Sequence, residues 1–188
     1  MPDHFDFLAP IYDRAIHAVH PQEIIRLAEL PTSGILLDAG GGTGRIGGAL
    51  RPYASQVIVA DLSMGMLKKA TTKDGLQPVC AKLEESPFPS NSIDRVVIVD
   101  AIHHVYDARL TVLELWRVLK PGGKMVIEEP DIHALPVKIV ALMEKLALMR
   151  SRFVSPERIA SFFTAPSARV RIEKSGYTAW IVVDKQPV

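Results

Sequence analysis

Short apolar runs alternate with helical patterns along most of the chain. Runs rich in aliphatic residues predict strands at 35–38, 57–61, 78–81, 96–100 and 124–128. The run at 96–100 is almost wholly apolar, as expected of a central strand covered on both faces. Helical patterns follow the first, second and fourth runs and end near residues 50, 70 and 119. This alternation is typical of a parallel sheet with crossover helices.

The pattern changes after Pro130. Residues 135–150 read as one long amphipathic helix and residues 156–163 as a shorter one. Two β-rich runs at 168–173 and 177–184 are separated by only a few residues, which favours an antiparallel hairpin. The predicted fold is therefore a Rossmann-like, doubly wound α/β sheet that is mostly parallel and carries a C-terminal antiparallel hairpin strand.

The chain shows no internal repeat, low-complexity tract or linker. Its 188 residues fit one domain, with residues 1–30 as an N-terminal helical extension or lid and 131–165 as a helical insertion. A stripe in that insertion either packs against the sheet or presents an apolar face to a ligand or a dimer partner. Its members are Leu135, Ile139, Leu142, Met143, Leu146 and Met149.

Composition and charge favour a small-molecule partner. The net charge is +1 and the basic residues are dispersed, so no nucleic-acid-binding face is expected. Cys80 is the single cysteine, and the acidic start at 1–6 lacks a secretory pattern, so we expect a cytoplasmic location. Charges interrupt the most apolar stretch, 135–149, so no membrane span is expected. The histidines offer no recognisable metal-ligand spacing.

The glycine loop at 40–47 is compatible with two kinds of nucleotide ligand. Residues 42–47 read GTGRIG, and Asp61 follows Gly42 by 19 positions, as in dinucleotide-binding oxidoreductases. Asp38 argues against a dinucleotide ligand, because its carboxylate can accept a hydrogen bond from an ammonium group but would repel a pyrophosphate. The loop alone leaves both interpretations open.

Three motifs resemble class I S-adenosylmethionine-dependent methyltransferases. Residues 38–44, DAGGGTG, match the family motif E/D-x-G-x-G-x-G. Residues 84–94, EESPFPSNSID, resemble the segment that leads into the fourth strand, and residues 115–124, LWRVLKPGGK, resemble the connection into the fifth. The resemblance implies an S-adenosylmethionine cofactor and an acceptor site near the 131–165 insertion.

The N-terminal segment resembles the opening of the ubiquinone/menaquinone biosynthesis methyltransferases. Residues 5–13 read FDFLAPIYD. The resemblance implies a small-molecule methyltransferase in which Tyr12 lies over the cofactor and bonds its carboxylate, whereas a tyrosine buried as an anchor is equally compatible with the sequence. A homodimer is possible.

The predicted cofactor residues lie at strand ends and in the loops that follow. Asp61 can accept both ribose hydroxyls, or else serve as an exposed helix cap. Leu62 and Met66 either contact the adenine or ribose or belong to the core. Lys82 stands where the family commonly has an aspartate for the adenine amino group, so backbone around Leu83, or Glu84, is expected to hold the base. The full set is Tyr12, Asp38, Gly40, Gly42, Gly44, Asp61, Leu62, Met66, Leu83 and Asp100.

His103 is the candidate catalytic residue. It follows the fourth strand together with His104, and a histidine there can remove a proton from an acceptor, although simple packing of the pair is the competing interpretation. The predicted function is in-line transfer of a methyl group from S-adenosylmethionine to a small molecule. The alternatives are an NAD-type oxidoreductase and a catalytically inactive binding module.

Overall fold

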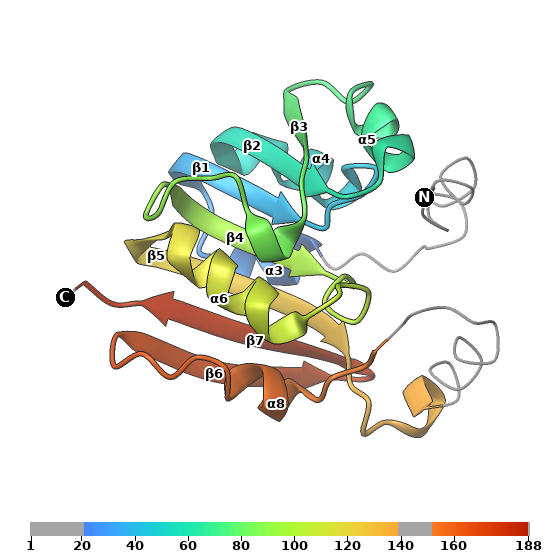
Figure 1. Ribbon diagram of the computed structural model, residues 1–188, viewed down its shortest axis with the longest axis vertical. Coiled ribbons are helices and arrows are strands. Elements are labelled where there is room, and N and C mark those ends of the chain that lie inside the picture. Colours follow the sequence, from blue (N-terminus) through green and yellow to red (C-terminus); the bar gives the residue numbers. More distant parts are fainter. Residues whose placement is uncertain (1–20, 139–151, 188) are drawn as a thin grey trace.

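A seven-stranded sheet forms the centre of the computed structural model, which describes residues 21–138 and 152–187 (Figure 1). The strand order is β3-β2-β1-β4-β5-β7-β6. Neighbouring strands from β1 to β5 pair in parallel, whereas β7 is antiparallel to both β5 and β6. The predicted doubly wound sheet with a C-terminal antiparallel hairpin is confirmed.

All the predicted strands are present, and several extend beyond their apolar runs. Their bounds are β1 Thr32–Ala39, β2 Ala54–Asp61, β3 Leu76–Cys80, β4 Ile93–Val99, β5 Leu119–Pro130, β6 Ala168–Ser175 and β7 Thr178–Lys185. The largest difference is in β5, which starts at Leu119 because that residue pairs with Ile93 before a register shift. Residues 120–123, KPGG, have the composition of a turn but therefore lie within the strand.

Helices connect the strands, and three of them begin at side-chain caps. The described helices are α3 Pro21–Leu27, α4 Arg45–Leu50, α5 Met64–Ala70, α6 Ala108–Val118 and α8 Pro156–Ala160, with 3-10 turns η1 Arg51–Tyr53 and η2 Leu83–Glu85. Ser63, Asp107 and Ser155 each accept a hydrogen bond from a backbone N–H three residues on. Such caps satisfy donors that the first helical turn cannot.

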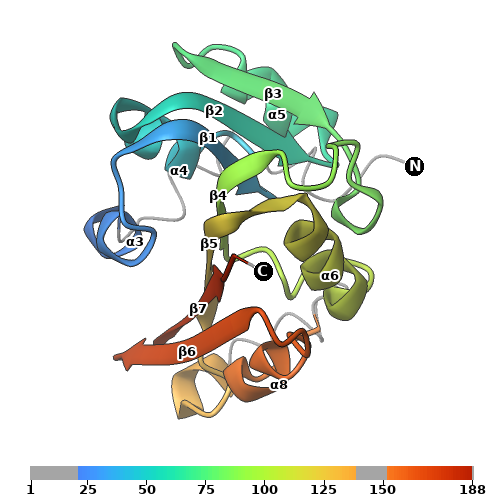
Figure 2. The same cartoon turned by 90° about the vertical axis from the view of Figure 1, so that its left-hand side faces the viewer.

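Helices lie on both faces of the sheet, α3 and α4 on one and α6 and α8 on the other (Figure 2), and an apolar layer packs on each face. Alternate residues of β5 illustrate the division, because Met125 and Ile127 belong to the layer under α6 and α8, while Val126 packs with α3 and α4. Side chains of a strand alternate between the two faces, so both layers draw on the same strands. The strands are thus fixed in register, and their carboxyl ends form one edge of the sheet.

The opposite, amino edge is held by polar contacts between the family-like motifs. Asp94 Oδ2 accepts from the Ile35 N–H at 2.8 Å and from Lys120 Nζ at 2.9 Å. Arg117 donates to the carbonyls of Ser86 and Phe88. The motifs at 84–94 and 115–124 therefore bind each other, and these contacts stabilise the fold.

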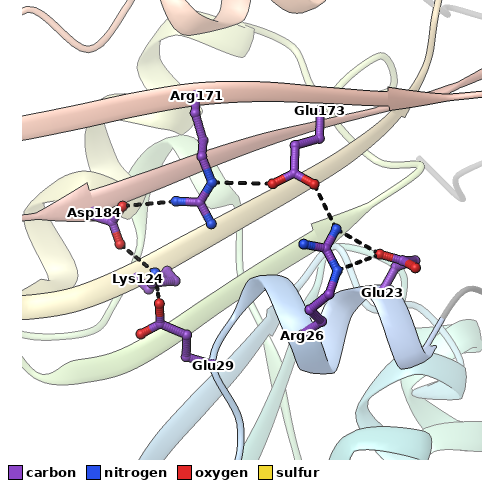
Figure 3. A network of polar contacts seen from close by, with 7 residues as sticks. All are labelled: Glu23, Arg26, Glu29, Lys124, Arg171, Glu173 and Asp184. Carbon is purple, nitrogen blue, oxygen red and sulfur yellow. Dashed lines mark hydrogen bonds and ion pairs between the residues drawn. The ribbon is translucent and has the colours of Figure 1, made fainter.

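An ion network fastens α3 to the C-terminal strands (Figure 3). Lys124 Nζ is buried between the carboxylates of Glu29 and Asp184, each at 2.6 Å. Arg26 reaches Glu173 of β6, also at 2.6 Å. The network comprises Glu23, Arg26, Glu29, Lys124, Arg171, Glu173 and Asp184. It joins segments that are distant in sequence.

The structure describes only part of the region after Pro130 in which helices are predicted. Residues 135–138 are helical, while most of the predicted 135–150 helix and its stripe lies outside the described residues. The helix expected at 156–163 ends at Ala160. In the ranges 21–138 and 152–187, no helix has the length and apolar character needed to cross a membrane. The division into extension, domain and insertion stays a prediction.

Candidate functional site

Acidic residues gather at the carboxyl edge of the sheet. Asp38, Asp61 and Asp100 lie at the ends of β1, β2 and β4, and Glu128 and Glu129 lie near the end of β5. β1 and β4 are adjacent although not consecutive, so their crossovers leave to opposite sides. Such a switch point is where open α/β sheets bind their ligands.

The glycine loop turns sharply at the end of β1. Gly40, Gly42 and Gly44 have φ angles of 71°, 54° and 72°, a region that side chains strongly disfavour. A Cβ on Gly40 would also lie 2.6 Å from that of Ala101. The Gly40 N–H donates to the Ala60 carbonyl at 2.7 Å. The loop is thus folded against the neighbouring strand ends. This conformation requires glycine at these positions.

Asp61 links the glycine loop to the end of β2. Its Oδ2 accepts from the Gly42 N–H at 2.9 Å, and its Oδ1 accepts from the Ser63 N–H at 2.7 Å. These two bonds orient the carboxylate, and each carboxylate oxygen has more than one acceptor site. Asp61 is partly exposed at the carboxyl edge of the sheet.

Asp38 lies beneath the glycine loop. Its carboxylate is 1% exposed and accepts from the Gly47 N–H at 2.7 Å. Burial raises the pKa of Asp38 to about 7, and the nearby Asp61 charge acts in the same direction. The contact shown by the structure is with the protein's own loop, and the proposed role toward an ammonium group stays a prediction.

Asp100 occupies a strained position after β4. Its φ is 51°, uncommon for a residue with a side chain, and its N–H donates to the Glu128 carbonyl at 3.0 Å. Burial raises the pKa of Asp100 to about 6, and the charge of Glu129 adds to the shift. An acid whose pKa lies closer to neutrality than usual is therefore found between the ends of β4 and β5.

The residues expected at the adenine end differ in accessibility. Leu62 is 55% exposed after β2, while Met66 and Leu83 belong to the core. The Leu83 side chain lies under Gly40, so only its backbone could reach a ligand. Lys82 is exposed. Of this group, Leu62 presents the most apolar side-chain surface at the edge.

Glu84 is engaged in a structural contact. Its Oε1 accepts from the backbone N–H groups of Tyr106 and Asp107 at 2.8 and 3.2 Å. These bonds join η2 to the start of α6. This carboxylate is therefore directed at the protein backbone.

His103 forms a buried pair with Glu129. The distance from His103 Nδ1 to Glu129 Oε2 is 2.5 Å, and both side chains are almost fully buried. The sequence reasoning missed Glu129, although two consecutive acids at the end of an apolar strand are an unusual signal. What it lacked was the pairing of β4 with β5, which brings these residues together.

His104 is held neutral beside His103. The two rings lie 4.0 Å apart between centroids. Burial, and to a smaller extent the neighbouring His103, lower the pKa of His104 to about 3. The two adjacent histidines thus have different environments, and Glu129 is paired with His103.

Glu128 points to the opposite face of the sheet from Glu129. Its Oε2 accepts from Trp180 Nε1 at 2.8 Å, and both side chains are buried. No cluster of three or more potential metal ligands occurs within the described ranges. Tyr12 lies outside those ranges.

The strand order, the glycine loop and the acid after β2 define the Rossmann-like fold of the S-adenosylmethionine-dependent methyltransferases. A Thermotoga maritima structure described as a possible histamine N-methyltransferase superposes with a TM-score of 0.79 at 19% identity, covering 97% of this chain and 98% of the other. The YcgJ protein of Bacillus subtilis gives 0.73 at 25% identity, covering 82% and 70%.

Residues 37–127 match the family model described as a methyltransferase domain. A demethylmenaquinone methyltransferase from Clavibacter sepedonicus is 33% identical over 144 residues, which are 71% of this chain and 59% of the relative. The chain thus spans little more than half of that relative. Neither the oxidoreductase nor the inactive-module alternative is supported by these matches.

Proposed function

We propose that the protein is an S-adenosylmethionine-dependent methyltransferase that acts on a small molecule. The observation that carries this proposal is the Asp61 carboxylate, which two backbone N–H groups orient beside the glycine loop. A carboxylate fixed in this way is suited to accept the two adjacent hydroxyls of a ribose.

The other residues of the carboxyl edge also fit this cofactor. It carries an ammonium and a sulfonium group, and acids at the ends of three strands favour positive charge. A Cβ on Gly42 would have Asp61 Oδ2 as its nearest described neighbour, at 3.9 Å, so a ligand could approach the backbone there. We assign Tyr12, Asp38, Gly40, Gly42, Gly44, Asp61, Leu62, Met66, Leu83 and Asp100 to cofactor binding.

Bound S-adenosylmethionine would supply an electrophilic methyl group. The protein's part is to align an acceptor with it and to keep water away, and such alignment contributes on the order of 7–11 kcal/mol. We propose His103 as the group that takes a proton from the acceptor. We propose a quinone precursor as the first acceptor to test, because the Clavibacter relative is a demethylmenaquinone methyltransferase.

Isothermal calorimetry with S-adenosylhomocysteine tests the cofactor assignment. We expect saturable binding with one site per chain, and no binding at millimolar ligand would reject it. Turnover is then measured with radiolabelled S-adenosylmethionine and demethylmenaquinone, followed by a metabolite extract if that compound is not methylated. NADH titration, followed by fluorescence transfer from tryptophan, is the matched control and should give no signal.

A further inference from the structure

We propose that Glu129 is a positioning residue that sets the tautomer of His103 and fixes the backbone of the acceptor side. The role of Glu129 in turnover rests on the proposed function. Its effect on the His103 tautomer does not depend on that function. Glu129 lies near the end of β5 and is 3% exposed. Ala101, Ile102 and His103, which follow β4, all contact its carboxylate.

The two oxygens of Glu129 have different partners. Oε1 accepts from the backbone N–H groups of Ala101 and Ile102 at 2.9 and 2.7 Å, and Oε2 faces Nδ1 of His103. Ionised carboxylates only accept hydrogen bonds, so His103 must donate through Nδ1–H. The segment after β4 and the histidine ring are thus held by one group from the next strand.

This arrangement leaves Nε2 of neutral His103 with the lone pair. A neutral imidazole carries one N–H and one acceptor nitrogen, and the bond made by one determines the state of the other. The ring plane is fixed as well, because Phe153 stacks on it at 4.5 Å with 13° between the planes. His103 is therefore oriented as a base before any acceptor binds.

Glu129 has a second role when His103 takes up a proton. As the acceptor atom gains the methyl group, the electron pair of the broken C–S bond stays on sulfur and the acceptor's proton moves to His103 Nε2. The resulting imidazolium is stabilised by the Glu129 charge, and the proton later passes to solvent. Asp100 and His104 are titratable groups near this pair, and Arg152 lies next to it, since its backbone N–H donates to the His103 carbonyl at 2.7 Å.

Nitrogen-15 NMR of the full chain without cofactor tests the tautomer directly. At pH 8 we expect His103 to show a protonated Nδ1 and an unprotonated Nε2, with the signals assigned by their loss in His103→Asn. A protonated Nε2 in the wild type would overturn the proposal. Because this measurement needs no variant of Glu129, it remains decisive even if such a variant does not fold.

The variant Glu129→Gln should reverse the tautomer. Its amide oxygen must stay with the N–H groups of Ala101 and Ile102, so its NH₂ faces Nδ1 and forces the proton onto Nε2. An unchanged tautomer contradicts the proposal. Glu157→Gln is the matched control, because Glu157 pairs with His133 at 3.1 Å on the exposed surface, and this change should leave the His103 signals unaltered.

Binding and turnover separate this inference from the proposed function. Glu129→Gln should bind S-adenosylhomocysteine within about threefold of the wild type, while kcat falls by roughly 100-fold or more with little change in KM. A tenfold loss of binding, or an unchanged kcat, would refute the positioning role. Failure of the wild type to bind the ligand would reject the methyltransferase proposal and leave the tautomer result standing.

Discussion

Asp38 and Asp61 lie near the carboxyl ends of neighbouring strands but face different surroundings. Asp61 is partly exposed and accepts from two backbone N–H groups, whereas Asp38 is buried and accepts from the Gly47 N–H. A charge is costly to bury and inexpensive at the surface. We therefore expect the two acids to contribute differently, Asp61 through direct contact with the cofactor and Asp38 mainly through the loop that it supports.

Replacing Asp61 should weaken cofactor binding. Asp61→Ala removes the acceptor proposed for the ribose hydroxyls, and we expect the Kd for S-adenosylhomocysteine to rise at least about tenfold, equivalent to roughly 1.4 kcal/mol. Calorimetry measures this change. Asp74→Ala is the control, because Asp74 is exposed in the turn before β3 and lies away from the site. Equal affinity of the two variants would disprove the ribose assignment.

The buried Asp38 predicts an unusual dependence of stability on pH. Because its pKa is raised from 3.8 to about 7, the native state holds a proton that the unfolded chain releases. Its contribution is thus fully present below pH 4 and is lost as pH rises toward 7. Relative to Asp38→Asn, the wild type should lose about 3 kcal/mol of unfolding free energy between pH 5 and pH 8.

Urea unfolding of both proteins at the two pH values provides the measurement. The asparagine keeps an oxygen for the Gly47 N–H but does not titrate, so the comparison cancels the opposite contribution of His104, whose pKa is lowered to about 3. If the wild type and the variant change in parallel between pH 5 and pH 8, Asp38 does not titrate in this window and the burial argument is wrong.

The ion pairs of the network around α3 are expected to contribute unequally to the stability of the protein. Lys124 is buried between Glu29 and Asp184, while Arg26 and Glu23 form a pair on the surface. Asp184→Asn leaves the buried ammonium with one exposed partner and should cost about 1–3 kcal/mol. Glu23→Gln should leave the urea midpoint unchanged. Similar effects from both variants would show that burial does not set the importance of these contacts.

The elements that sequence reasoning found were those with an uninterrupted apolar pattern. The ends it missed are polar, such as Thr32 and Ser33 at the start of β1 and Ser55 at the start of β2. Their strand conformation comes from pairing with neighbours, which no local pattern records. In β5 the turn-like residues after Leu119 likewise extend the strand because β4 pairs with it.

The candidate site was predictable where chemistry follows a strand directly. The glycines follow the first predicted strand and Asp61 ends the second, so both could be assigned positions from sequence alone. Glu129 could not, because its partners come from another strand and their meeting depends on sheet order. The polar contacts of Glu84, which secure η2 to α6, also required the folded chain.

Across the whole molecule, the two edges of the sheet have different tasks. The carboxyl edge carries the residues proposed for binding, while the amino edge is held by Asp94 with Lys120 and the Ile35 N–H. Asp94→Ala should therefore cost about 2 kcal/mol of stability and leave the Kd for S-adenosylhomocysteine within twofold. A large change in affinity at unchanged stability would show that the two edges are not independent.

The bond between Trp180 and Glu128 has a practical consequence. The chain has two tryptophans, and they lie toward opposite edges, since Trp180 pairs with Glu128 near Asp100 while the Trp116 carbonyl accepts from Lys185 near the start of β4. Indole emission responds to the polarity and charge around the ring. The fold thus contains its own optical reporters, and Trp116→Phe would leave a single emitter beside the proposed site, where arrival of a ligand can be timed without an attached dye.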